Sequence, residues 1–162
     1  MDMLVKLYEL PAAPPLDIGG IRIRRIMGPD KQALLEWLRG HFSSVWAAEC
    51  EIAFSRQPVS CFIASNAGKI RGFSVYDVTA KGIFGPMGVA EEYRSRGIGK
   101  SLLLTALHDM RHQGYAYAVI GWAGPTRFYE KYVGAKVIEA SQAERGMYSD
   151  LLRHDPKVSA KG

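Results

Sequence analysis

Residues 81–113 carry the sequence KGIFGPMGVAEEYRSRGIGKSLLLTALHDMRHQ, and this stretch decides how the rest of the chain is interpreted. Its first part, residues 83–89, is a short apolar run of the kind that forms a buried strand. After Gly99 the apolar residues recur at helical spacing, and Gly114 stands where the helix is expected to end. The stretch therefore predicts a strand, a loop containing glycines, and a helix that begins directly after the loop.

A strand that passes through glycines into a helix is suited to binding an anion. The first N–H groups of a helix have no partner within the helix, and the helix dipole places partial positive charge there. Gly97 and Gly99 let the backbone approach a ligand, and Arg94, Arg96 and Lys100 add full positive charge. We therefore expect a phosphate-binding loop here.

The glycine spacing distinguishes this loop from two other nucleotide-binding loops. A Rossmann loop needs a third glycine where this chain has Leu102, and the Walker A pattern does not fit the residues between Gly88 and Ser101. The spacing is instead Arg-x-x-Gly-x-Gly after a strand. The alternative interpretation is an ordinary strand-to-helix turn that is capped by glycine.

Length and composition indicate a globular protein. The chain has 162 residues, of which 48% are apolar and 23% charged, so we expect one domain over residues 1–162. Residues 1–20 form an N-terminal arm or strand in this interpretation, and residues 153–162 form a polar tail. No apolar run approaches the roughly 20 residues of a membrane span, and the N-terminus lacks signal-peptide features, so the cytoplasm is the expected location and no membrane partner is expected.

Charge and cysteine content narrow the expected ligands. A net charge of +5 favours an anionic partner, either nucleic acid or a polyphosphate cofactor. The chain has no basic stripe with interleaved aromatic residues, which makes nucleic acid the weaker choice. Cys50 and Cys61 do not have metal-ligand spacing, and the four histidines are not paired, so no metal is expected.

The order of elements follows from hydrophobic periodicity and from breaks at Gly and Pro. The expected strands cover residues 21–26, 59–65, 70–78, 83–89 and 115–120, the last of them covered on both faces, and residues 4–10 form a strand or an extended arm. Four helices are expected. The first begins after residues 28–30, the second covers residues 45–56, the third begins after the glycine loop, and the fourth covers residues 126–133. Residues 135–140 and 146–152 are expected to close the chain as an antiparallel pair. Whether the N-terminal arm pairs within the domain or with a partner chain stays open, and so does a homodimer.

Gly85 and Pro86 lie inside the strand at residues 83–89. Proline cannot donate a ladder hydrogen bond, and glycine in a strand often marks a bulge, so this strand should diverge from a neighbour. Backbone groups at Met87 and Val89 would then be free to pair with an extended ligand that carries amides. The alternative is an edge strand that proline merely kinks.

The helix at residues 45–56 places two carboxylates differently. Trp46 and Cys50 have the spacing of a buried stripe, Glu49 borders that stripe, and Glu51 points nearly opposite. We therefore expect Glu51 in solvent and Glu49 partly desolvated. Glu49 is then either a salt-bridged residue at the helix edge or a functional carboxylate.

Two separated motifs resemble one family. The Arg-x-x-Gly-x-Gly loop, and the segment GPTRFYEK at residues 124–131 followed by VGA at residues 133–135, resemble the acetyl-CoA loop and the "P-x-x-F-Y-x-K-x-G-A" segment of the Gcn5-related N-acetyltransferases (GNAT). This chain has one extra residue before Gly134. The resemblance covers residues 21–152 and implies an α/β fold of the α+β type. The sheet would be mixed, mostly antiparallel and V-shaped, with helices on both sides, and the run at residues 84–89 resembles bacterial members of unassigned acceptor.

The resemblance also implies where acetyl-CoA, the cosubstrate, would bind. It would lie in the V, between the strand that ends at Val89 and the strand at residues 116–120, and Tyr129 would place its hydroxyl near the CoA sulfur. The alternative for Tyr129 is a core aromatic residue packed with its neighbours. The implied acetyl-CoA contacts are Met87, Gly88, Val89, Arg94, Ser95, Arg96, Gly97, Ile98, Gly99, Lys100 and Ser101.

The implied activity is N-acetyl transfer from acetyl-CoA to a primary amine by direct aminolysis. The acceptor stays open among an amino sugar, a polyamine, an amino acid, another small amine and a protein N-terminus. Glu49, Asp77 and Tyr76, in that order, are candidates for the base, and Trp46, Tyr76 and Tyr148 for an aromatic acceptor wall. The alternatives are a non-catalytic CoA-binding regulatory domain and, less favoured, a basic nucleic-acid-binding domain.

Overall fold

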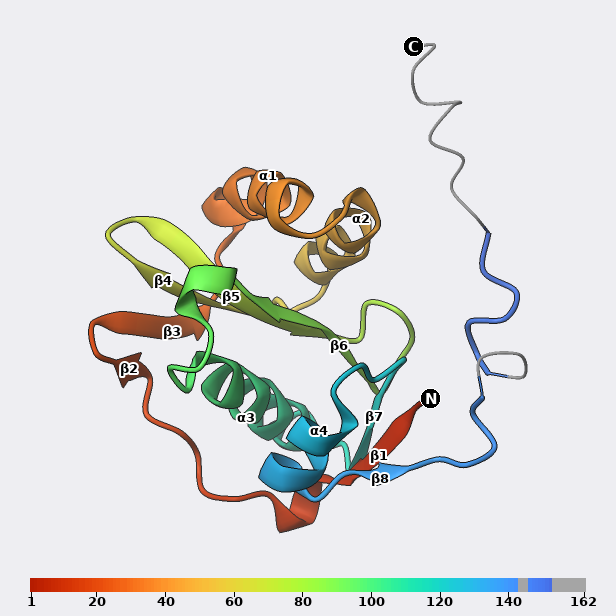
Figure 1. Ribbon diagram of the computed structural model, residues 1–162. Coiled ribbons are helices and arrows are strands. Elements are labelled where there is room, and N and C mark those ends of the chain that lie inside the picture. Colours follow the sequence, from red (N-terminus) through yellow and green to blue (C-terminus); the bar gives the residue numbers. More distant parts are fainter. Residues whose placement is uncertain (143–145, 153–162) are drawn as a thin grey trace.

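The structure, a computed structural model, describes residues 1–142 and 146–152. These residues form one eight-stranded sheet in the order β2-β3-β4-β5-β6-β7-β1-β8, with helices on both faces (Figure 1). The strands are β1 Met3–Lys6, β2 Asp17–Ile18, β3 Ile21–Arg25, β4 Cys61–Asn66, β5 Lys69–Tyr76, β6 Ile83–Val89, β7 Tyr117–Ile120 and β8 Lys136–Val137. The helices are α1 Lys31–His41, α2 Ser44–Glu51, α3 Ile98–His112 and α4 Thr126–Val133.

The sheet is mixed but mostly antiparallel, as the sequence predicts. Within the described sheet, every neighbouring pair is antiparallel except β6 and β7. The parallel pairing covers Ile83 with Val119 and Phe84 with Ile120, and β7 ends there while β6 continues to Val89. The two strands therefore diverge, which gives the sheet its open V.

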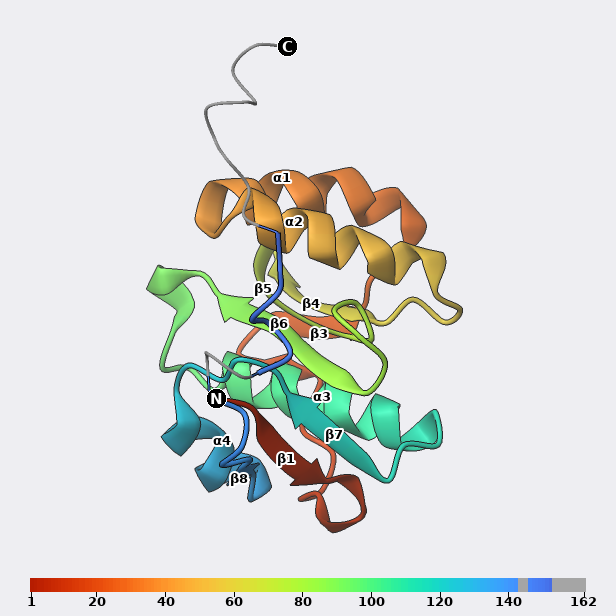
Figure 2. The ribbon, with the colours of Figure 1, turned by 90° about the vertical axis from the view of Figure 1, so that its right-hand side faces the viewer.

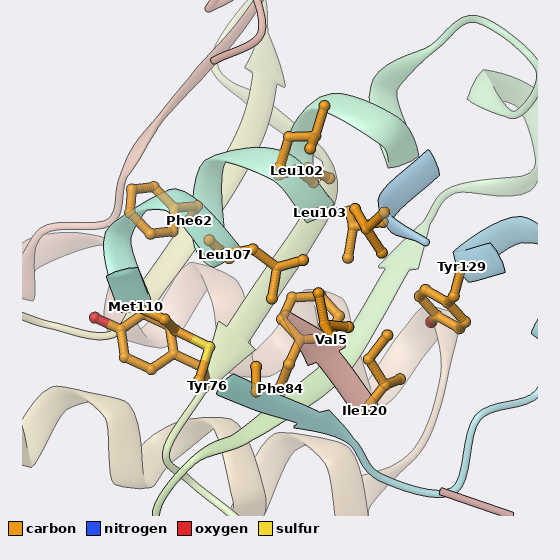
Figure 3. Packing of buried hydrophobic residues seen from close by; sticks show 14 of the residues in the cluster. Val5, Phe62, Tyr76, Phe84, Leu102, Leu103, Leu107, Met110, Ile120 and Tyr129 are labelled. Atoms are coloured by element: carbon orange, nitrogen blue, oxygen red, sulfur yellow. The ribbon is translucent and has the colours of Figure 1, made fainter. Parts of the chain in front are cut away.

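Each face of the sheet has its own apolar core. Helices α1 and α2 cover one face, where Leu34 and Leu38 pack with Phe73 and Val75 of β5 (Figure 1). Helices α3 and α4 cover the other face, where α3 contributes the fully buried Leu103 and others. Figure 3 shows this second cluster, with side chains from α3 meeting those of β1, β6 and β7. Because side chains alternate along a strand, residues 73 and 75 of β5 face one core and residues 74 and 76 face the other.

The N-terminal arm pairs within the sheet. Strand β1 lies between β7 and β8, with Met3 opposite both Ile120 and Val137 (Figure 2). Met3 and Val5 are completely buried, so this strand is part of the core. The predicted antiparallel pair at the C-terminal end is wrong because β1 occupies the position beside β8. Residues 146–152 instead form turns, and the predicted tail at residues 153–162 lies outside the described residues.

The prediction that β7 is covered on both faces is also wrong. Ala118 and Ile120 are buried, but Tyr117 is 48% exposed on the opposite face, where it contacts Tyr8. Helices α1 and α2 cover that face farther along the sheet, over β4 and β5 (Figure 1). Within residues 1–142 and 146–152, no helix is both long and apolar enough to cross a membrane.

Candidate active site

The divergence of β6 from β7 begins at an irregularity in β6. The register between β5 and β6 runs from Ser74–Met87 to Tyr76–Phe84, so Gly85 and Pro86 together oppose a single residue of β5. This is a β-bulge at the position where the sequence predicted one, because proline cannot donate to the ladder and glycine tolerates the bend. The bulge turns the end of β6 away from β7.

Backbone groups beyond the bulge face the open side of β6. Ala90 N donates to Arg71 O on β5, which fixes the alternation of bonded and non-bonded pairs along this ladder. By that alternation Gly88 bonds to β5, whereas Met87 and Val89 turn their N–H and C=O groups toward the gap. The Val89 carbonyl accepts a hydrogen bond from Arg94 Nε at 3.2 Å, so the groups left for a ligand are the Val89 N–H and both groups of Met87.

The loop after β6 presents the N-terminus of α3. Ser95 and Gly97 both have left-handed backbone angles, with φ of 63° and 83°, and these two residues turn the chain into the helix. Among the described residues no side chain caps the first turn, so its amide groups lie open at the surface. A Cβ built at Gly97 meets nothing within 4 Å, so glycine is required there for its φ rather than for lack of space.

The basic residues of the loop are held in position by aromatic rings and by backbone carbonyls. The Arg96 guanidinium lies 4.8 Å from the Tyr93 ring centre and donates to Glu92 O. Lys100 Nζ lies 5.2 Å from the ring of Tyr132 on α4. These contacts hold two full positive charges beside the helix N-terminus, as a phosphate site requires. Ser101 is buried beneath the loop and Ile98 is part of the core, so their contribution to a ligand would come from the backbone.

A cavity of about 780 Å³ opens between the diverging strands. Its walls are Phe84 to Met87 of β6, the turn at residues 121–125 after β7, and one side of α2. Tyr148, Leu151 and Leu152 also line it, and the blue stretch that contains them runs in front of β6 toward α2 (Figure 2). The described lining combines large apolar side chains with the carboxylate of Glu49.

Glu49 lies where the cavity meets the loop between β5 and β6. Its side chain is half-buried, and Thr79 Oγ1 donates to Glu49 Oε1. Trp46, one turn earlier on α2, lines the same cavity, and Glu51 is exposed in an ion pair with Lys31 at 2.9 Å. The predicted contrast between the two glutamates is confirmed, since one borders the buried stripe and the other faces solvent.

Two tyrosines line the cavity and remain protonated at neutral pH. Burial raises the pKa of Tyr129, on α4, to about 12, and its side chain is only 7% exposed. Burial and the nearby carboxylates of Asp2 and Glu49 raise the pKa of Tyr148 to about 12. Both phenols are therefore hydrogen-bond donors rather than bases in the physiological range.

The structure separates Tyr76 and Asp77 from this group. Tyr76 is buried under α3, and Figure 3 shows it at the opposite end of the cluster from Tyr129. Asp77 Oδ1 accepts from Gly82 N at 2.7 Å, and Asp77 Oδ2 accepts from Tyr115 OH at 2.6 Å. Both residues line a smaller cavity of about 360 Å³ instead. The structure therefore does not bring either residue into the larger cavity with Glu49 and Trp46, and the roles of Tyr76 in the acceptor wall and of both residues as bases stay predictions.

Sequence reasoning missed the contacts by which the N-terminus shapes the cavity. Asp2 Oδ1 accepts from Trp122 N at 2.8 Å, and Met1 O accepts from Ala123 N at 2.9 Å, so the N-terminus holds the turn that forms one wall. Phe42, stacked on Trp46 at 5.0 Å, packs against the backbone of Gly88. The N-terminal contacts had no signal in the sequence, because they join residues that are far apart in the described chain.

The fold combines a mixed open sheet, two diverging strands and a glycine loop at a helix N-terminus. This combination defines a class of protein. The chain belongs to the acetyltransferase (GNAT) family, whose model matches residues 31–135. Comparison with curated proteins finds no match. Across the described residues, no group of three or more His, Cys, Asp or Glu side chains is arranged to hold a metal ion.

Solved structures of the same fold agree with this assignment. A GCN5-related N-acetyltransferase from Sphaerobacter thermophilus is 24% identical with a TM-score of 0.68, over 84% of this chain and 47% of that one. The glucosamine N-acetyltransferase region of a fungal multi-domain β-N-acetylglucosaminidase is 16% identical with a TM-score of 0.67, over 83% of this chain and 19% of that one. A GNAT acetyltransferase from Brucella melitensis, in complex with acetyl-CoA, is 19% identical with a TM-score of 0.50, over 67% and 80%. The chain thus spans about half or less of the first two structures.

Proposed function

We propose that the protein is an N-acetyltransferase that moves the acetyl group of acetyl-CoA to a primary amine by direct aminolysis. The observation that carries the proposal is the end of the β6–β7 pairing at Phe84 and Ile120. Three features follow one another beside the diverging strands. They are the anion loop, the free amides of β6, and the cavity with the Glu49 carboxylate and the Tyr129 phenol. This order matches the order of pyrophosphate, pantetheine and thioester in acetyl-CoA.

The loop and β6 would bind the cosubstrate. The open amides at the start of α3, with Arg96 and Lys100 beside them, suit the pyrophosphate. The N–H and C=O of Met87 and the N–H of Val89 suit the pantetheine amides, which would pair with β6 as an added strand. The thioester would then lie where the cavity begins, and the same amides could stabilise the oxyanion that forms as the amine attacks.

Glu49 and Tyr129 supply the proton transfers. The amine must be neutral to attack, and the Glu49 carboxylate, directly or through water, accepts its proton. The amine forms the new C–N bond to give the tetrahedral oxyanion, whose collapse restores the carbonyl and breaks the C–S bond, so that the electron pair leaves with sulfur. Tyr129, protonated because its pKa is raised to about 12, donates a proton or a hydrogen bond to the departing thiolate.

The test is CoA release, followed with a thiol reagent, when acetyl-CoA and a panel of primary amines are added. Amine-dependent release together with an acetylated product in the mass spectrum supports the transferase. If CoA raises the melting temperature but no amine stimulates its release, the protein is a non-catalytic CoA-binding regulator.

A further inference from the structure

The cavity is lined mostly by apolar side chains and has a single charged group. Among the described residues that line it, Glu49 carries the only formal charge, and no basic side chain is present. Its rim is formed by apolar residues that stay substantially exposed, with Trp122 at 63%, Leu151 and Val45 at 58% and Ile52 at 45%. Exposed apolar side chains gathered around a cavity indicate that an apolar molecule covers them when it binds.

From this lining we infer the acceptor class: a primary monoamine whose remaining part is apolar, aromatic or aliphatic, and which carries no carboxylate, phosphate or sugar hydroxyls. This inference rests on the proposed function, because it names the substrate of the same site. A second charge would lose hydration in this cavity without a second described side chain of opposite charge to replace it. Several hydroxyls would outnumber the few described polar side chains of the lining, which are Glu49, Thr79, Tyr129 and Tyr148. The ammonium group would be drawn to Glu49, which lines the cavity from α2 and is half-buried.

Aromatic side chains favour the same class. Trp122 and Tyr148 lie with ring centres 5.2 Å apart, and Trp46 lines the cavity from α2. Aromatic faces bind both apolar rings and ammonium groups. The Tyr148 phenol contacts the backbone at Gly121, where a Cβ would not fit, so one aromatic face is fixed against the turn after β7.

The inference separates substrates that differ by one group. We expect kcat/KM for 2-phenylethylamine to exceed that for phenylalanine, which adds a carboxylate, by about 100-fold, the order of discrimination that an apolar pocket achieves against a substrate with an added polar group. Phenylalanine amide has the same skeleton without the negative charge and should recover part of the activity, since its carboxamide still loses hydration in the cavity. Hexylamine should likewise exceed glucosamine and spermidine.

A pair of variants at one rim residue tests whether the apolar rim excludes carboxylates. Leu151→Lys puts a cation at an exposed lining position, whereas Leu151→Met keeps the position apolar. The lysine variant should narrow the preference for 2-phenylethylamine over phenylalanine by about 10-fold, while the methionine variant should keep it. Equal or better turnover of phenylalanine, glucosamine or spermidine by the unmodified protein would overturn the inference.

Binding measurements test the acceptor class independently of the proposed transferase activity. If no amine releases CoA, calorimetry with 2-phenylethylamine and phenylalanine, each added to the protein saturated with CoA, still tests the cavity. Preferential binding of 2-phenylethylamine would support the apolar monoamine class even though the transferase proposal had failed. Equal or reversed binding would refute the class itself.

Discussion

The Tyr76 hydroxyl donates a 2.6 Å hydrogen bond to Asp109 Oδ2, and the same carboxylate receives the Arg25 guanidinium through two contacts of 2.9 and 2.6 Å. This group ties β3, β5 and α3 together beside the core. The Asp109 side chain is 12% exposed and that of Arg25 is 32% exposed, so the ion pair is largely protected from solvent.

Asp109→Asn should destabilise the fold by about 2–3 kcal/mol, because it leaves a partly buried guanidinium without its carboxylate. Tyr76→Phe removes one hydrogen bond and leaves the ion pair, so its cost should be smaller, about 1.5 kcal/mol. Urea denaturation measures both changes. Because neither residue lines the larger cavity, kcat of the folded variants should stay at the wild-type value, and a large loss in Tyr76→Phe would restore it as a site residue.

Gly97→Asp should abolish acetyl-CoA binding, since it places a negative charge where the pyrophosphate is proposed to lie. The matched control is Gly97→Asn, which has nearly the same size and tolerates the left-handed backbone better than most residues. Affinity measured by calorimetry should fall much less in the asparagine variant. Equal losses in the two variants would mean that backbone strain, not charge, was responsible.

Tyr129→Phe should lower kcat by about 100-fold and leave acetyl-CoA affinity nearly unchanged if the phenol assists the departing thiolate. The deficit should be constant between pH 7 and 9, because the pKa of about 12 keeps the phenol protonated throughout that range. A variant that turns over normally while chemistry limits the rate would make Tyr129 a core residue only.

The same raised pKa predicts a change in stability at alkaline pH. In the unfolded chain a tyrosine ionises near pH 10, whereas folded Tyr129 holds its proton to about pH 12. The stability linked to this proton is complete below pH 10 and is lost as the pH rises from about 10 to 12. Tyr129→Phe should therefore show a shallower fall of the unfolding free energy over this range than the wild type.

Glu49→Gln should lower kcat/KM by about 100-fold if the carboxylate accepts the amine proton, because the amide cannot act as a base. The substitution keeps the size of the side chain and its contact with Thr79, so the melting temperature should change little. Glu51→Gln, on the same helix but exposed, is the control and should leave kcat/KM unchanged. Normal kcat/KM in Glu49→Gln would show that water or another group accepts the proton.

CoA and acetyl-CoA should raise the melting temperature more than ADP does at equal concentration. At one hundred times Kd a ligand stabilises by about 2.7 kcal/mol, which for a chain of this size shifts the melting temperature by about 5–10 °C. The difference from ADP would come from pantetheine pairing with Met87 and Val89. Equal shifts would reduce the site to a phosphate loop, and stabilisation by oligonucleotides alone would favour nucleic acid.

The sequence predicted the elements that depend on local pattern. Strand β6 and helix α4 have the predicted bounds, since one is an apolar run broken by Gly85 and Pro86 and the other lies between Pro125 and Gly134. The divergence beside the glycine loop was predicted for the same reason. Periodicity also placed Glu49 at the edge of the apolar stripe of its helix, and this edge lines the larger cavity.

Features that depend on distant contacts were not predicted. Nothing local to residues 3–6 indicates that they pair with β7 and β8, and this pairing displaced residues 146–152 from the expected strand. Tyr76 was misplaced for a different reason. Alternation along β5 puts Tyr76 on the same face as Ser74, whose hydroxyl donates to Leu102 O on α3. That this face packs against α3 rather than α2 is decided by the tertiary arrangement of the helices, which the local pattern does not show.

The position of β1 also bears on the order in which the chain folds. Asp2 N donates to Ser141 Oγ across 139 residues of sequence, and β1 bonds to strands from the last third of the chain. During synthesis β1 cannot form these pairings until the residues of β7 and β8 have been made. Contacts of such long sequence separation slow folding, so closure of the sheet by β1 is expected to be a late step, after the local β4-β5-β6 meander has formed.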